Sequence, residues 1–230
     1  MNRVLSVDEI QIKTKKATYF VSIFLFIILL LSVCFFAYKW HVRERNKNVF
    51  DEIYYSELFL MDWGFVFFPN YLKPSLAHVD GIDKSGRWGA LMGGWTDDWT
   101  VESYKKNSIG ENKEIKIWFY KDQKVMIIEY KFYISEEVTL SFTYQYNVET
   151  KCLHQSFLLY DTLLKEDFKE DAVYSYLDQL ELSILDIKQY SNEALYEIFL
   201  NDWFVGNEGY SQFSLDNLGK LTITKDPILE

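Results

Sequence analysis

The sequence predicts an α+β domain that follows a single membrane-spanning helix. Three observations predict this fold class. An uncharged apolar run of 22 residues covers 17–38, four stretches within 114–160 alternate apolar and polar residues, and stretches with helical apolar spacing lie on both sides of them. Alternating strands have one apolar face, and the helices supply apolar faces to cover it. We therefore expect an N-terminal transmembrane helix and one domain with an antiparallel meander sheet of four or more strands packed against helices.

The run at 17–38 is long enough to cross a bilayer, since about 20 helical residues span the hydrocarbon core. A secretory signal is shorter and ends in small residues, whereas Phe35 and Phe36 stand where a signal peptidase would need them. The stretch LSVC at 31–34 loosely resembles a lipoprotein box, which would be cleaved before Cys34 and acylated there. The bulky valine before this cysteine disfavours that alternative. Either arrangement fixes the chain to a membrane.

Flanking charges do not decide the orientation of the span, because four basic residues lie on each side of it. Residues 48–230 carry 16 basic and 31 acidic side chains, a formal charge of −15. An anionic cytoplasmic leaflet would repel such a domain. We therefore expect 1–16 to be a cytoplasmic segment, 17–38 the transmembrane anchor, 39–47 a basic juxtamembrane linker and 48–230 an extracytoplasmic domain.

Charge and cysteine content exclude some classes of protein. Nucleic-acid binding requires basic side chains against phosphates, and the domain has no basic stripe outside 39–47, so we expect no nucleic-acid partner. The two cysteines are Cys34, inside the apolar run, and Cys152, so the domain has no internal disulfide. The lack of a disulfide is in keeping with the surface of a Gram-positive bacterium, and one unpaired thiol is also compatible with a cytosolic location.

The first element expected in the domain is a helix over about 48–62. Asn48 is a suitable cap, and apolar side chains follow it at helical spacing. The next stretch, 64–94, contains two of the three prolines and many glycines. It is therefore expected to be mostly loop, with at most one short strand.

The sheet is predicted from EIKIWFY, KVMIIEYKFYI, EVTLSFTYQYN and KCLHQSFLLY, which are joined by links of two or three residues. Links this short make neighbouring strands antiparallel, and successive side chains point to opposite faces. The face expected to be buried holds Ile115, Ile117, Phe119, Met126, Ile128, Tyr130, Phe132, Val138, Leu140, Phe142, Tyr144, Leu153, Phe157 and Leu159. The opposite face is polar with interspersed aromatics: Lys116, Trp118, Tyr120, Glu129, Lys131, Tyr133, Thr139, Ser141, Thr143, Gln145, His154 and Ser156.

Two more helices and a strand are expected after the sheet. DAVYSYLDQL and SNEALYEIFLNDWFVG have helical apolar spacing. The second of these is expected to begin at a cap, Ser191 or Asn192, and to end at Gly206. A final short strand, KLTIT, follows the turn DNLG.

No motif for catalysis or for a cofactor is present. The sequence lacks H-E-x-x-H, G-x-S-x-G, a P-loop and a paired C-x-x-C. The acidic stretch at 80–83 lacks the spacing of an EF-hand, and the adjacent Asp97 and Asp98 would point to opposite faces of a strand. We therefore expect no enzyme, no metal site and no cofactor.

Aromatic residues make up 18% of the chain, more than a core of this size requires. Tyrosine and tryptophan on a rigid sheet are favoured anchors for protein partners. We therefore expect the polar face to bind a protein partner through five residues: Trp118, Tyr120, Glu129, Lys131 and Tyr133. The alternative is that the aromatics only enlarge the core.

Three stretches resemble the TipC family of streptococcal immunity proteins. They are NVFDEIYYSE after the apolar run, TYQYNVETKCL within the sheet, and NDWFVGNEGYSQFSLDNLGKLTI near the end. The resemblance implies a membrane-anchored protein whose extracytoplasmic domain binds and neutralises a toxin. Such a toxin is exported by type VII secretion and attacks the cell-wall precursor lipid II. We therefore expect occlusion of a cognate toxin. The alternatives are a sensory or scaffolding ectodomain of a cell-envelope assembly and, third, an enzyme.

Overall fold

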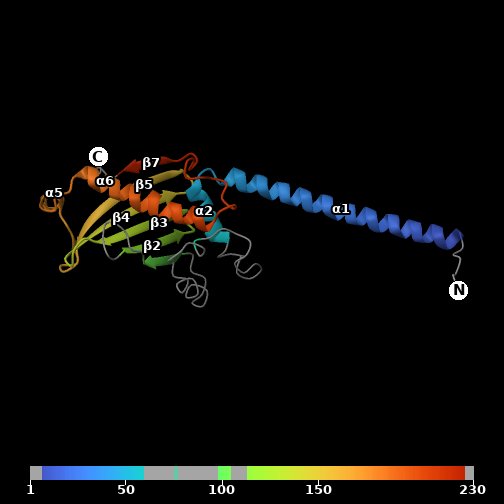
Figure 1. Ribbon diagram of the computed structural model, residues 1–230, viewed down its shortest axis with the longest axis horizontal. Coiled ribbons are helices and arrows are strands. Elements are labelled where there is room, and N and C mark those ends of the chain that lie inside the picture. The colour runs from blue at the N-terminus through green and yellow to red at the C-terminus, as the bar shows by residue number, and fades with distance from the viewer. Residues whose placement is uncertain (1–6, 60–75, 77–97, 105–112, 226–230) are drawn as a thin grey trace. The chain divides into compact units, whose positions relative to one another are not determined.

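The computed structural model describes residues 7–59, 76, 98–104 and 113–225 (Figure 1). The loop expected at 64–94 lies outside the described residues, apart from Leu76. The chain divides into two compact units, residues 1–46 and 47–230. Each unit has its own architecture.

The first unit contains one helix, α1 (Val7–Arg45), which continues past both ends of the predicted span. Its part from Thr18 to Arg45 is long and apolar enough to cross a membrane, a property shared by membrane anchors and N-terminal signal sequences. The hydroxyl of Ser32 donates to the carbonyl of Ile28 at 2.8 Å. This bond satisfies the hydroxyl within the helix, as an apolar environment requires.

The second unit is built on a seven-stranded sheet, and its α+β class is confirmed. Six antiparallel strands lie in sequence order, and the seventh pairs in parallel with β5 (Figure 1). The strands are β1 (Asp98–Tyr104), β2 (Lys113–Tyr120), β3 (Val125–Tyr133), β4 (Val138–Asn147), β5 (Cys152–Asp161), β6 (Glu166–Asp167) and β7 (Thr222–Lys225). Strands β2 to β5 confirm the predicted meander, and β1 and β6 extend it on either side.

Two helical segments cover the apolar face of the sheet. The longer consists of α6 (Ile184–Asn192), the π-helical η3 (Glu193–Leu200) and α7 (Asn201–Gly206), which follow one another without a break. The other is α2 (Val49–Phe59), where the helix over 48–62 was predicted. A further helix, α5 (Glu170–Gln179), contributes buried residues to the same core.

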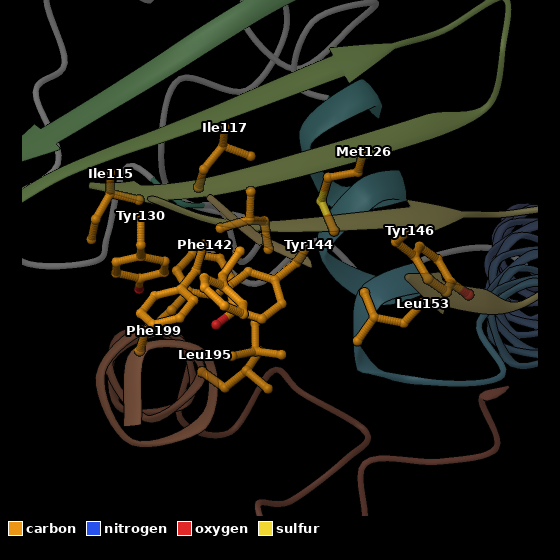
Figure 2. Close-up of a cluster of buried hydrophobic side chains, with 14 of the residues drawn as sticks. Ile115, Ile117, Met126, Tyr130, Phe142, Tyr144, Tyr146, Leu153, Leu195 and Phe199 are labelled. Atoms are coloured by element: carbon orange, nitrogen blue, oxygen red, sulfur yellow. The ribbon is translucent and has the colours of Figure 1, made fainter. Parts of the chain in front are cut away.

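Every side chain expected on the buried face is buried. Figure 2 shows how the aromatic rings of the sheet meet the helix: Tyr130 packs against Phe199 of η3 with ring centroids 6.5 Å apart. On α2, the ring of Phe50 lies 5.3 Å from that of Tyr146. Burial of large aromatic side chains is the main source of stability in such a core. Residues far apart in the sequence therefore hold this unit together.

The predicted helix start at Ser191 or Asn192 is wrong, because the helix begins at Ile184. Ser183 and Asp186 form a capping box in which each side chain accepts from the other residue's backbone N–H. Ser191 is instead buried inside the helix, and its carbonyl accepts a 2.7 Å hydrogen bond from the hydroxyl of Tyr144. The π-helical segment η3 begins two residues after Ser191, at Glu193.

Candidate partner-binding face

The polar face of β2 to β5 is defined by the side chains that alternate with the core. It holds the polar set expected from the sequence together with Ile127, Leu158 and Tyr160. Tyr133 is 41% exposed, and the other four predicted binding residues are partly exposed. Thr139 and Ser141 also belong to this face but are buried, and each lies between two larger side chains of the neighbouring strands.

Glu129 lies near the middle of the polar face with its carboxylate held by neighbours. One oxygen accepts a 2.9 Å hydrogen bond from the hydroxyl of Ser141, and the other lies 3.5 Å from the ammonium of Lys131. In the register of the sheet, Glu129 stands opposite Lys116 and Thr143. The structure therefore brings Glu129 and Lys131 together in one partly exposed, preorganised polar cluster.

The predicted aromatic anchors do not form one cluster. Tyr120 pairs with Val125 at the start of β3, whereas Tyr133 is the last residue of that strand. Eight residues of extended chain separate the two positions by about 26 Å. Trp118 lies on the same side as Tyr120 and pairs with Ile127. The face therefore has two ends, one with Trp118 and Tyr120 and the other with Tyr133.

The end of the sheet near Tyr120 is called the entry end, because the first residues of the unit, 47–52, pack there. It also includes Tyr146 and Lys151, which contact Asp51. The end near Tyr133 is called the far end, and it includes the last residue of β5, Asp161.

A network of buried polar groups at the entry end was not predicted. Asp51 of α2 is fully buried, and it accepts hydrogen bonds from the hydroxyl of Tyr146 at 2.6 Å and the ammonium of Lys151 at 2.8 Å. Its other oxygen accepts from the backbone N–H of Lys47 at 2.8 Å. The amide of Asn48 donates to the same tyrosine hydroxyl at 2.7 Å. Burial, followed by the bond to Asp51, raises the pKa of Tyr146, so its hydroxyl remains a donor.

Glu52, the next residue of α2, is a second buried carboxylate. It accepts from the hydroxyl of Ser211 at 2.7 Å and from the backbone N–H of Gln212 at 2.9 Å. Burial raises the pKa of Glu52, and these two hydrogen bonds oppose that shift without cancelling it. Glu52 therefore fastens the segment after α7 to α2 and binds a proton more readily in the folded chain than in the unfolded chain.

This raised pKa gives Glu52 a defined pH dependence. Between its ordinary value of 4.5 and its folded value, the native state holds more protons than the unfolded state, so stability falls as pH rises through that window. We expect Glu52→Gln to remove this fall, since an amide can still accept from Gln212 and donate to Ser211. Urea unfolding at several pH values above 4.5 measures how the free energy of unfolding depends on pH, and Glu197→Gln, at an exposed position, is the control. Equal pH slopes for Glu52→Gln and the unaltered chain would contradict the assignment.

Within the described part of the chain, no group of three or more His, Cys, Asp or Glu side chains could hold a metal ion. His154 contacts the hydroxyl of Thr224 through Nδ1 at 3.1 Å, and the thiol of Cys152 lies 3.7 Å from the same hydroxyl. These contacts fasten β7 to β5. The acidic stretch at 80–83 and Asp97 lie outside the described residues.

Residues 21–226 match a protein family described as TipC immunity protein-like. Among solved structures, TipC2 from Streptococcus intermedius B196 is similar to this chain with a TM-score of 0.55 and 17% identity, covering 78% of this chain and 96% of that one. At this identity the likeness supports the fold alone. No curated protein matches the chain.

Proposed function

Because the chain belongs to the TipC immunity protein-like family, we propose that it binds a cognate secreted antibacterial toxin and occludes the toxin's active site. The family match carries this proposal, since it covers both the apolar helix and the sheet. Membership in an immunity family indicates a role in protection rather than in catalysis. From the resemblance noted in the sequence, the proposed toxin is one exported by type VII secretion that attacks lipid II.

The proposed location is the outer side of the cell membrane, with α1 as a single-pass anchor. Two features support this arrangement: the apolar part of α1 is long enough to span a bilayer, and the second unit is strongly acidic. A toxin that attacks a cell-wall precursor acts at this same surface. Tethering would keep the immunity protein where the toxin arrives.

We expect protease added to intact, wall-stripped cells to digest the second unit and leave a small membrane-bound fragment. The reason is that the proposed topology exposes residues 47–230 outside the membrane. Immunoblotting with tags at either end of the chain measures the fragments. A cytoplasmic protein serves as the control for cell integrity. Digestion that occurs only after lysis would place the unit inside the cell and contradict the topology.

The proposed binding surface is the polar face of the sheet. Strands β2 to β5 hold its side chains on a rigid hydrogen-bonded frame, so little conformational entropy is lost on binding. Partly exposed aromatic residues on such a frame can enter a partner's pocket and dominate the interface energy. Among the predicted anchors, Trp118 has the largest side chain and lies beside the Glu129 cluster. It is therefore the first residue to test.

We expect Trp118→Ala to weaken toxin binding by more than about 2 kcal/mol and to abolish protection of toxin-expressing cells. The melting temperature should change little, because Trp118 lies on the face opposite the core. Calorimetric titration with a purified candidate toxin domain measures affinity, and co-expression with that toxin measures protection. Tyr210→Ala is the matched control, since this aromatic is 61% exposed and lies outside the sheet.

Two results would remove Trp118 from the proposed surface: a stable variant with unchanged affinity, or a variant that loses its fold. A wild-type chain that neither binds the candidate toxin nor protects against it would overturn the immunity function itself. Testing both chains against the same toxin separates these outcomes.

A further inference from the structure

Two leucines are exposed together at the far end of the sheet. Leu163 and Leu164 lie in the turn between β5 and β6, and each is 68% exposed. A single exposed leucine is ordinary on a protein surface, but two adjacent ones at the tip of a turn form a protruding apolar feature. We call this feature the leucine tip.

The turn that presents the leucine tip is held by several hydrogen bonds. One carboxylate oxygen of Asp161 accepts from the backbone N–H groups of both Leu163 and Leu164, each at 2.8 Å. The backbone N–H of Lys165 donates to the carbonyl of Asp161 at 2.9 Å. The leucines therefore project from a fixed backbone, and little conformational entropy of the turn would be lost when a partner binds them.

The same turn is fastened to its neighbour between β3 and β4. The backbone N–H of Thr162 donates to the carbonyl of Glu137 at 2.8 Å, and its hydroxyl donates to the carbonyl of Glu136 at 2.5 Å. The acidic side chains of these two residues are exposed beside the leucine tip. The two turns therefore form one rigid surface.

The surroundings of the leucine tip are acidic. Four exposed carboxylates lie in the two turns and in β6: Glu136, Glu137, Glu166 and Asp167. The exposed ammonium groups of Lys165 and Lys169, in and just after the same segment, offset only half of this charge. The polar face also has its exposed apolar side chains at this end, where Tyr133 and Leu158 are each 41% exposed. An apolar centre with a charged rim is the usual composition of a protein-binding surface.

We propose that the leucine tip is a docking element for a protein that carries an apolar pocket rimmed by basic side chains, and that this protein is the toxin. The assignment of the partner rests on the immunity function proposed above. The tip would extend the contact from the polar face around the far end of the sheet, so that the toxin is bound by two surfaces at an angle. Toxin binding would then depend on Leu163 and Leu164, which belong to no catalytic or metal-binding sequence motif.

Other occupants of the leucine tip are disfavoured by charge and position. Two copies of the chain would bring their acidic rims together, and anionic lipid headgroups would repel the same rim. The tip also lies at the end of β5 opposite Lys151, which contacts Asp51 at the entry end. Ten residues of β5 place the tip about 30 Å from the site where the chain enters the unit. A soluble protein partner fits both facts.

The test uses the full chain in detergent micelles and the same purified candidate toxin domain as the Trp118 experiment. The double variant Leu163→Ser/Leu164→Ser should weaken binding by at least about tenfold, with an unchanged melting temperature. Leu185→Ser is the control, because this leucine is 74% exposed but lies on α6, and it should bind as the wild type does. The charge reversal Glu166→Lys/Asp167→Lys should slow association and weaken its salt dependence, which tests the rim without altering the leucines.

Each outcome decides between the two proposals. If the wild type binds and both double variants bind equally well, the leucine tip is not part of the interface, while the immunity function stands. If the wild type does not bind the toxin, the immunity function fails and the tip proposal fails with it. If the leucine variant changes only the oligomeric state of the chain, the tip serves a second copy, and the proposed partner is wrong.

Discussion

Asp51→Ala is expected to lower the free energy of unfolding of the second unit by about 3–5 kcal/mol. The carboxylate is fully buried, and it accepts hydrogen bonds from Tyr146, Lys151 and the backbone of Lys47. Its removal leaves a buried tyrosine hydroxyl and a backbone N–H without their acceptor, which costs more than the bonds themselves contribute. Urea unfolding of the full chain in micelles, followed by tryptophan fluorescence, measures this loss.

The control for Asp51→Ala is Asp178→Ala, which removes an exposed carboxylate from α5 and should change stability by less than about 0.5 kcal/mol. A double-mutant cycle with Tyr146→Phe isolates the bond between the two side chains. If Asp51→Ala is as stable as Asp178→Ala, the buried network does not hold the entry end together.

Gly219→Ala is the second large effect, with an expected loss of about 2–4 kcal/mol. Gly219 has a φ of +82°, which a residue with a Cβ adopts only with strain. The added methyl group would also lie 2.5 Å from the carbonyl oxygen of Lys47 and 2.8 Å from the ring of Phe213. The backbone pairing between the C-terminal segment and the start of α2 would then have to shift.

Gly209→Ala is the matched control, because it separates the two causes. Gly209 has nearly the same backbone angle, a φ of +80°, but nothing lies within 4 Å of the position that a Cβ would occupy. Only the strain of the backbone remains there, so the expected loss is about 1 kcal/mol. Thermal unfolding measures the loss of stability in both variants. Equal losses of stability would show that the close contacts at Gly219 do not contribute to the effect.

The sheet was predictable because its pattern is local. The side chains of β2 to β5 alternate with period two and the links between the strands are short, so the faces, the order and the bounds follow from neighbouring residues. The parallel addition of β7 to β5 was not predictable in this way. Its partner residues, such as Leu153 and Ile223, are 70 positions apart, and four exposed residues carry little pattern.

The helix start failed for a related reason. Ser191 and Asn192 are good cap residues by type, but the hydroxyl of Tyr144 occupies the carbonyl of Ser191 and makes a buried serine acceptable inside the helix. The actual signal was the capping box of Ser183 and Asp186, eight residues earlier. The choice between Ser183 and Ser191 as the cap therefore depended on the contact with Tyr144, which the local sequence does not reveal.

The candidate site was predictable in part. Alternation assigned Trp118, Glu129 and Tyr133 to one face, and the register brings Glu129 close to Lys131. The separation of Tyr120 from Tyr133 could also have been inferred, since each ends its strand and adjacent strands run in opposite directions. The burial of Asp51 could not have been inferred, because acidic residues in the first turn of a helix are usually solvated. Its hydrogen-bond partner Tyr146 is 95 positions away in the sequence.

The pairing at the entry end also sets the order in which the protein can fold. The backbone of Val49 donates to Leu218, that of Lys220 donates to Lys47, and the side chain of Asn48 reaches a carbonyl 172 residues away. The hairpins of the sheet join neighbouring strands and can form early during synthesis, but this closure must wait until residue 220 has been made. A chain that is still being synthesised is therefore open at the entry end, and the second unit completes its fold only after residue 220 has emerged.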